Sequence, residues 1–150
     1  MKTYEIYTDG ACRGNPGKGG WGVYNKTTGD TLHGFERNTT NNQMELTAAI
    51  KGLLHLATCK IEETDFVIMY TDSIYVKNGI TNWIHNWKLN DWKTSQKKPV
   101  QNKKLWVLLD NLQTKYMQNI SWEWVKAHDV CEGNNKADSL ANEAIDLNEM

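Results

Sequence analysis

The chain has 150 residues, 39% of them hydrophobic and 23% charged, and a formal net charge of −1. This composition indicates one ordinary globular domain, and it excludes both a disordered chain and a transmembrane helix, which needs roughly 20 consecutive apolar residues. The first residues lack the apolar stretch of a signal peptide and the three cysteines include no Cys-x-x-Cys pair, so we expect a cytoplasmic protein without a disulfide framework or a cysteine zinc site.

Hydrophobic periodicity predicts a chain in which three strands come first and further strands then alternate with helices. The segment 13–22 contains Pro16 and many glycines, so it is predicted as a loop. The predicted elements, in chain order, are strands over 3–8, 22–26 and 31–37, a helix around 46–57, a strand over 66–70, a short helix over 73–79 that ends at Gly79, a helix around 105–116, a strand over 120–125 and a helix around 137–145.

This order of elements predicts an α/β fold built on a mixed sheet. Three strands joined by short connections form an antiparallel meander, and the later strand–helix–strand units add parallel strands with helices on the sheet faces. The functional site of such a sheet lies beyond the carboxyl ends of its parallel strands.

Charge is unevenly distributed along the chain. The segment from Lys77 to Lys104 carries seven lysines and one acidic residue, whereas the rest carries ten basic and seventeen acidic residues. Trp83, Trp87 and Trp92 lie among these lysines. A basic, aromatic segment on an acidic body favours a polyanionic ligand over a merely solvated surface.

Four acidic residues stand at positions from which their side chains could meet. Asp9 follows the first predicted strand and Asp72 the fourth, so both emerge at one end of the sheet if these strands are parallel neighbours. Glu45 and Asp138 lie in the first turns of two predicted helices. Taken singly, each residue fits a turn, a helix cap or a helix dipole. Gathered together they need a hard cation such as Mg²⁺ or Mn²⁺, and four carboxylates can hold two such ions for displacement at phosphorus.

Two competing chemistries fit the residues less well. The glycine-rich segment is not a Walker A phosphate loop, because Cys12 stands at its first glycine position and Gly19 follows Lys18. Glycoside hydrolysis requires only two carboxylates and leaves the basic aromatic segment unexplained.

Several different short motifs follow one another along the chain. They are Tyr7-Thr8-Asp9-Gly10-Ala11-Cys12, Gly14-Asn15-Pro16-Gly17, Thr40-Asn41-Asn42-Gln43-Met44-Glu45-Leu46, Thr71-Asp72-Ser73, Gly79-Ile80, Trp122-Glu123-Trp124-Val125-Lys126, His128 and Ala137-Asp138. Together they closely resemble a bacterial type 1 ribonuclease H from about residue 4 to residue 145. The resemblance implies a single domain over residues 1–150 with a five-stranded mixed sheet. It also implies endonucleolytic cleavage of the RNA strand of RNA/DNA hybrids, which leaves 3′-hydroxyl and 5′-phosphate ends.

The same resemblance implies roles for individual residues. Two Mg²⁺ ions, with Mn²⁺ as a substitute, are expected on Asp9, Glu45, Asp72 and Asp138, while His128 takes the position of the family's mobile histidine. The loop around His128 departs from the family pattern. A basic protrusion at about 81–99 is expected to hold the DNA strand. The expected substrate contacts are Asn15, Thr40, Asn41 and Gln43, then Lys88, Trp92, Lys97 and Lys98 of the protrusion, and Asn134.

Three alternatives remain at this point. A hybrid-binding protein without catalysis should lack one of the four carboxylates, and none is missing. A DNA nuclease of the same fold is disfavoured by Thr40-Asn41-Asn42 and by the basic protrusion. A domain cut from a reverse transcriptase is disfavoured by Met1, which stands directly before the first strand. We expect a monomer with no obligate protein partner and no membrane association.

Overall fold

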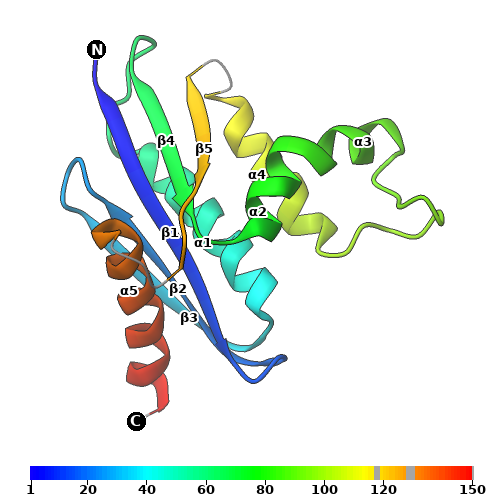
Figure 1. The fold of residues 1–150 in the computed structure, drawn as a ribbon, viewed down its shortest axis with the longest axis horizontal. Coiled ribbons are helices and arrows are strands. Elements are labelled where there is room, and N and C mark those ends of the chain that lie inside the picture. Colours follow the sequence, from blue (N-terminus) through cyan, green and yellow to red (C-terminus); the bar gives the residue numbers. More distant parts are fainter. Residues whose placement is uncertain (117–118, 128–130, 150) are drawn as a thin grey trace.

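Figure 1 shows the computed structural model of the chain, which describes residues 1–116, 119–127 and 131–149. A five-stranded sheet with the order β3-β2-β1-β4-β5 forms its centre. The first three strands pair antiparallel, whereas β4 runs parallel to β1 and β5 runs parallel to β4. The mixed α/β sheet expected from the sequence is therefore confirmed. The strands are β1 (Thr3–Arg13), β2 (Gly17–Asn25), β3 (Thr31–Thr39), β4 (Phe66–Thr71) and β5 (Ile120–Trp124).

Helices cover both faces of this sheet. In Figure 1, α1 (Asn41–Leu56) lies behind the sheet and α5 (Glu132–Glu149) lies in front of it. Between β4 and β5 the chain forms α2 (Ile74–Asn78), a π-helical turn η1 (Gly79–Trp83), α3 (Ile84–Leu89) and α4 (Lys103–Thr114). No helix in the described part of the chain is long and apolar enough to cross a membrane.

The main core fills the space between the sheet, α1 and α4. Ile6 and Met69 of the sheet, Leu46 and Leu53 of α1, and Trp106 of α4 are all almost completely buried there. Burying a large apolar side chain contributes roughly 1.5–3 kcal/mol, so this core holds α1 firmly against β1. The position of any polar side chain at the start of α1 is fixed by the same contacts.

The prediction of a loop over the glycine-rich segment 13–22 was wrong. β1 continues to Arg13 and β2 begins at Gly17. Two of its glycines lie directly beneath α5. A Cβ atom on Gly20 would come within 2.2 Å of the Ala141 carbonyl oxygen, and one on Gly22 within 2.3 Å of the Ala137 carbonyl oxygen. These glycines therefore allow a helix to lie on a strand.

Gly79 likewise does not end a helix, because the chain passes from α2 through η1 into α3. Its φ of −63° is an ordinary helical value. A Cβ atom at this position would lie only 2.0 Å from the ring of Trp106. The glycine leaves room for that tryptophan.

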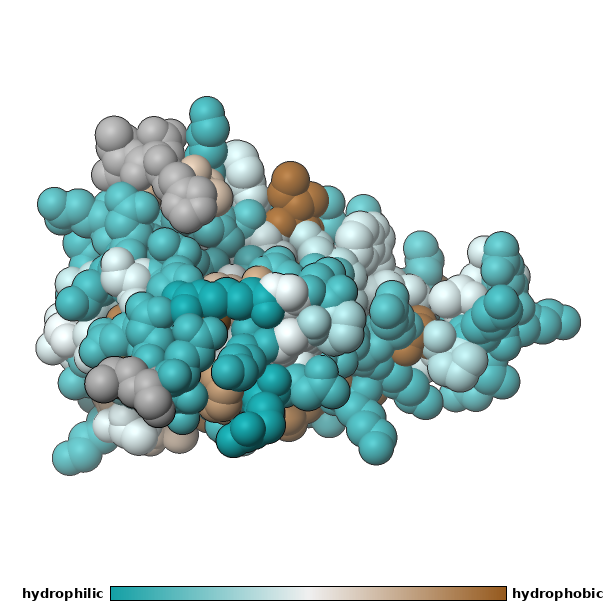
Figure 2. Space-filling view, turned by 90° about the horizontal axis from the view of Figure 1, so that it is seen from below, coloured by the Kyte–Doolittle hydropathy of each residue, from teal (hydrophilic) through white to brown (hydrophobic). Residues whose placement is uncertain are grey.

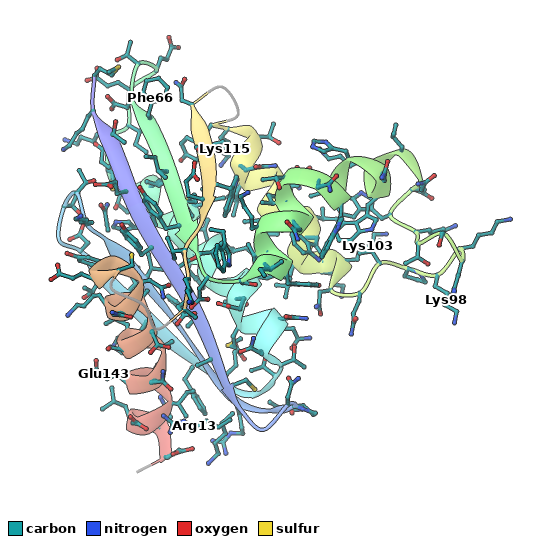
Figure 3. The ribbon with its side chains drawn as sticks, viewed as in Figure 1. Arg13, Phe66, Lys98, Lys103, Lys115 and Glu143 are labelled. Carbon is teal, nitrogen blue, oxygen red and sulfur yellow. The ribbon has the colours of Figure 1, made fainter. Side chains whose placement is uncertain are left out.

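The segment after η1 leaves the body of the protein as a protrusion (Figure 1). Lys98 lies near its far tip, whereas Lys103 stands where α4 begins (Figure 3). Figure 2 shows the protrusion from below as a narrow, mainly hydrophilic extension. A cluster of packed aromatic rings, with centroids 5.2 to 6.3 Å apart, forms its base. Its members are Tyr75, Trp83, Trp87, Trp92 and Trp106.

Candidate active site

The parallel pair at the centre of the sheet brings two acidic residues side by side. β1 and β4 pair as far as Thr8 and Thr71, and the next residues are Asp9 and Asp72. The prediction that Asp9 follows the first strand was wrong. Asp9 lies within β1, which remains paired with β2 as far as Arg13. β4 does end at Thr71, so its pairing with β1 stops just before the two carboxylates. Asp9 is only 3% exposed.

Helix α1 presents a third carboxylate to the same place. The helix begins after Thr40, whose hydroxyl oxygen accepts a hydrogen bond from the backbone N–H of Gln43 at 3.2 Å. Glu45 therefore lies just beyond the first turn, and Thr40 is the residue that caps the helix. The backbone N–H of Gly10, on β1, donates to the Glu45 carboxylate. This bond joins the start of α1 to the strand that carries Asp9.

Helix α5 supplies the fourth carboxylate. The helix begins at Glu132, five residues earlier than predicted, so Asp138 lies in its second turn. Asp138 lines the same hollow of about 290 Å³ as Asp9, Glu45 and Asp72, and its proximity contributes to the raised pKa of Asp9. All four predicted acidic residues therefore meet at one place, although they come from four separate elements.

The carboxylates lie close enough to repel one another strongly. Asp9, Glu45 and Asp72 each offer an oxygen atom, and these atoms lie within 4.8 Å of one another. Burial, and then the charges of Glu45 and Asp72, raise the pKa of Asp9 far above its ordinary value. Burial and the charge of Asp72 raise the pKa of Glu45 in the same direction. Such a group either retains protons or binds a cation, and a site with only oxygen donors favours hard ions such as Mg²⁺ and Mn²⁺.

This hollow is smaller than a second one at the opposite end of the sheet. The second hollow, of about 820 Å³, is lined by the loop before β4 and the end of α4. Among the residues described, only Asp9, Glu45 and Asp72 form a group of three metal-ligating side chains with converging atoms. Chemistry and not volume therefore identifies the candidate site.

Two further residues hold Asp72 in place. Trp124, on β5, donates its indole N–H to the Asp72 carbonyl oxygen at 3.0 Å. Asn134, on α5, donates from Nδ2 to the Asp72 carboxylate at 3.4 Å, and it is 1% exposed. The sequence predicted Asn134 as a substrate contact, whereas its buried amide lies against a carboxylate. Trp124 was not predicted as a site residue. Its contact with Asp72 depends on the parallel pairing of β5 with β4, which hydrophobic periodicity does not reveal.

The predicted substrate contacts Asn15, Asn41 and Gln43 lie at or beside the start of α1, where Asn41 also lines the carboxylate hollow. The side-chain oxygen of Asn15 accepts from the backbone N–H of Asn41 at 3.1 Å, which ties the β1–β2 connection to the start of α1. Gln43 donates from Nε2 to the side-chain oxygen of Asn102 at 3.3 Å. Asn102, which the sequence did not single out, precedes α4 with a left-handed φ of 61°. An asparagine directly before a helical pattern was the available signal.

Comparison with known proteins decides the family. The family model described as RNase H matches residues 1–146. The chain belongs to the RNase H family. A ribonuclease H from Hydrogenovibrio crunogenus is 51% identical over 149 residues, which cover 97% of each chain. One from Francisella philomiragia is 54% identical over 141 residues, covering 93% of this chain and 88% of that one.

Solved structures agree with this result. LC11-RNase H1, isolated from compost, is 28% identical, with a TM-score of 0.76 and full coverage of both chains. Its structure in complex with an RNA/DNA hybrid gives a TM-score of 0.70 and 28% identity, covering 98% of this chain and 99% of that one. Family membership confirms both the resemblance noted in the sequence motifs and the class of enzyme, an endoribonuclease of the ribonuclease H type.

The protrusion of this RNase H chain contains two kinds of lysine. Lys97 and Lys98 are exposed near its tip. Lys88, by contrast, pairs its ammonium group with the Asp110 carboxylate of α4 at 2.7 Å, and Asp110 is buried. Lys88 therefore joins α3 to α4. Trp92 is partly buried, with its ring centroid 6.3 Å from that of Trp87.

One predicted residue of the RNase H site is not placed. His128 lies outside the described residues, in the connection between β5 and α5. Its assignment stays a prediction from the sequence.

Proposed function

We propose that the protein hydrolyses the RNA strand of RNA/DNA hybrids with the help of two divalent cations, leaving 3′-hydroxyl and 5′-phosphate ends. The observation that carries this proposal is the convergence of the Asp9, Glu45 and Asp72 oxygens within 4.8 Å, with Asp138 lining the same hollow. Hybrid cleavage is further supported by family membership and by the hybrid complex of LC11-RNase H1.

The donor set fits magnesium. Asp9, Glu45, Asp72 and Asp138 offer only carboxylate oxygens, and a cation offsets the mutual repulsion of these groups. Bound there, such ions neutralise charge on the phosphoryl group and activate water. Mn²⁺ has similar ligand preferences and is expected to substitute.

The residues of the chain itself have positioning roles. The Gly10 N–H holds the Glu45 carboxylate, and Trp124 and Asn134 hold Asp72 from its main-chain and side-chain ends. These contacts preorganise the site before substrate arrives. Hydrolysis adds water across the bond between phosphorus and the 3′-oxygen, so the phosphate stays on the 5′ end of the downstream product. His128 is proposed to move a proton near the scissile phosphate and to assist product release.

The substrate contacts near the start of α1 are proposed to select the hybrid. Asn15, Asn41 and Gln43 are polar, lie next to the carboxylates and suit the minor groove, where RNA displays its 2′-hydroxyl groups. Thr40 is proposed to bind a phosphate of the DNA strand. Its hydroxyl oxygen caps α1, which leaves the hydroxyl hydrogen as a donor.

The protrusion, residues 81–99, is proposed to bind the DNA strand through Lys97 and Lys98, with Lys88 and Trp92 near its base. Residues 1–150 are proposed to act as one domain and as a monomer. The cysteines Cys12, Cys59 and Cys131 are all free thiols, which supports a reducing, cytoplasmic compartment.

The test is a cleavage assay on three labelled duplexes of one sequence: an RNA/DNA hybrid, duplex RNA and duplex DNA. We expect Mg²⁺-dependent cutting of the hybrid alone, loss of cutting in EDTA, and 5′ ends that a phosphatase can dephosphorylate. Comparable cutting of duplex DNA would instead indicate a DNA nuclease of the same fold.

A matched pair of variants ties the activity to the carboxylates. Asp72→Asn removes one charge from the cluster and should lower kcat/KM by several orders of magnitude. Asp146→Asn removes one charge from an exposed site on α5, where Asp146 pairs with Arg13, and should cleave normally. Full activity of a folded Asp72→Asn protein would contradict the metal assignment.

A further inference from the structure

The carboxylate of Asp138 is contacted by a side chain that has no role in the function described so far. Asp138 is only partly buried, whereas Asp9 and Glu45 are 3% and 5% exposed, so packing restrains its carboxylate less. Asn142 lies one turn further along α5. Its Nδ2 group is 3.3 Å from Asp138 Oδ1 and 3.0 Å from the Asp138 carbonyl oxygen. One amide group therefore contacts both the side chain and the main chain of the residue that carries the fourth carboxylate.

The neighbours of Asn142 determine which way its amide faces. A main-chain carbonyl oxygen only accepts hydrogen bonds, so the amide atom beside the Asp138 carbonyl must be the donor, Nδ2. On the other side, Arg13 Nη2 lies 3.4 Å from Asn142 Oδ1, and a guanidinium group only donates. A reversed amide would place oxygen against oxygen and nitrogen against nitrogen. The donor side of Asn142 is therefore directed at Asp138.

Arg13 is itself held by two acidic residues of α5. It is the last residue of β1, and its Nη1 lies 2.7 Å from an Asp146 carboxylate oxygen and 3.1 Å from one of Glu149. Both ion pairs are at the surface, and Arg13 keeps one when the other is removed. A chain of hydrogen bonds thus runs from the end of β1 through Asn142 to Asp138.

Such a contact matters for a carboxylate that binds a cation. An aspartate side chain that nothing restrains changes between several rotamers, and only some of them direct its oxygens at the ion. The hydrogen bond from Asn142 favours one rotamer and uses only one of the two carboxylate oxygens. Loss of a partner that orients a ligating side chain typically weakens metal binding roughly 10–100-fold.

We propose that Asn142 is a positioning residue that orients the Asp138 carboxylate for divalent-cation binding, with Arg13 fixing the direction of its amide. This inference rests on the proposed function, because it assigns a role at the same carboxylate site. The effect of Asn142 should therefore appear in the affinity for the cation, whereas kcat at saturating Mg²⁺ should change little.

Asn148 provides a matched control on the same helix. Its Nδ2 group donates to the Ala144 carbonyl oxygen at 2.8 Å, which is the contact four residues back along the helix that Asn142 also makes. Within the described part of the chain, Asn148 contacts no carboxylate. Leucine has nearly the shape of asparagine but no hydrogen-bonding group. Asn142→Leu and Asn148→Leu thus each remove one amide from α5, and only the first removes a bond to Asp138.

Mn²⁺ binding by the full-length protein without substrate is the first measurement, because the electron paramagnetic resonance signal of the free aqueous ion decreases as the ion binds. We expect Asn142→Leu to weaken Mn²⁺ binding about tenfold, at the low end of the range for such partners, and Asn148→Leu to bind Mn²⁺ as the wild type does. Asn142→Gln should recover most of the loss, because glutamine can also donate to an aspartate one helical turn away.

A Mg²⁺ titration of hybrid cleavage is the second measurement. Asn142→Leu should need about tenfold more Mg²⁺ for half-maximal cleavage, with kcat at saturating Mg²⁺ close to that of the wild type. Thermal unfolding in EDTA checks that each variant is folded, and Asn142→Ala, which removes the same amide, replaces Asn142→Leu if that protein is unfolded.

Equal Mn²⁺ affinities of the wild type and a folded Asn142 variant without the amide would overturn the proposal. An equal loss of affinity in Asn142→Leu and Asn148→Leu would also overturn it, because the cause would then be a general change in α5. Absence of hybrid cleavage by the wild type would instead reject the proposed function, and the Mn²⁺ comparison would still test the role of Asn142.

Discussion

Replacing Asp9 with asparagine should make the metal-free protein more stable while abolishing cleavage. Asp9 and Glu45 are 3% and 5% exposed, and their oxygens lie within 4.8 Å of each other and of Asp72. An amide has nearly the same shape as a carboxylate but no charge. The variant therefore removes repulsion from a crowded site with little change in packing.

The size of the effect has a calculable ceiling. Two charges no more than 4.8 Å apart repel by at least about 3.5 kcal/mol at an effective dielectric constant of 20, so Asp9 between two ionised neighbours would cost about 7 kcal/mol or more. The protein avoids this cost by keeping a proton. Holding one proton at pH 7 on a group with an ordinary pKa near 4 costs only about 4 kcal/mol. We therefore expect Asp9→Asn to stabilise the metal-free protein by about 2–4 kcal/mol at neutral pH.

The pH dependence has a definite sign. Burial and neighbouring charges raise the pKa values of Asp9 and Glu45 in the folded state, so above about pH 4 the folded protein holds more protons than the unfolded chain. Its stability is fully present below the unfolded pKa and decreases as pH rises toward the raised folded pKa. The advantage of Asp9→Asn should thus be small near pH 4 and should grow toward pH 8.

Thermal unfolding in EDTA at several pH values measures this difference. Each kcal/mol should shift the midpoint by about 2–4 °C in a chain of this length. Glu36→Gln, on the exposed surface of β3, is the matched control and should change little. Saturating Mg²⁺ should stabilise the wild type more than the variant. A variant that gains no stability, or gains the same amount at every pH, would refute the repulsion argument.

Four further predictions concern the lysines of the protrusion, His128 and the packing of α5. Lys97 and Lys98, changed together to alanine, should raise KM more than they lower kcat, and each lost phosphate contact should flatten the log–log salt dependence by about one unit. Lys88→Ala should instead lower stability by about 1–2 kcal/mol, because its buried carboxylate partner on α4 loses a charged hydrogen bond; an unaltered denaturation midpoint would argue against this. His128→Ala should lower kcat by about 10²-fold, and a comparison of single with multiple turnover separates chemistry from release, while equal rates to wild type would reject its role. Gly22→Ala should destabilise the protein by about 1–3 kcal/mol through overpacking and should weaken Mg²⁺ activation, which a Mg²⁺ titration of activity measures.

Sequence reasoning succeeded where a pattern had one structural meaning. The apolar run at 66–70 predicted the interior strand β4, and its parallel pairing with β1 then placed Asp9 next to Asp72. It failed at the glycines. Gly20 and Gly22 interrupt a strand pattern, and no local rule shows that a helix 120 residues later will pack on them. Gly79 was misinterpreted for the same reason. A side chain there would collide with Trp106, which lies on a different helix.

The candidate site shows the same division. Acidic residues near predicted strand ends and helix starts can be recognised in the sequence, so the carboxylates were predictable. The pairing of Lys88 with Asp110 was not, because two residues 22 positions apart become neighbours only after α3 and α4 pack. The contact of Trp124 with the Asp72 carbonyl likewise depends on strand order, which periodicity leaves open.

The close contact of α5 with β2 affects how the carboxylate site tolerates mutation. Gly20 and Gly22 face the Ala141 and Ala137 carbonyl groups, so the two elements touch through main chain, and the spacing between them is set by peptide dimensions. Elsewhere in the protein, exchanging one core side chain for another of different size shifts the helix above it. At Gly20 and Gly22 no strand side chain separates β2 from α5, so we expect the distance from Asp138 to the carboxylates on the sheet to respond little to changes of side-chain size elsewhere in the core. The reaction centre is thereby shielded from much of the variation that the fold can absorb, at the cost of two positions where any side chain lowers stability.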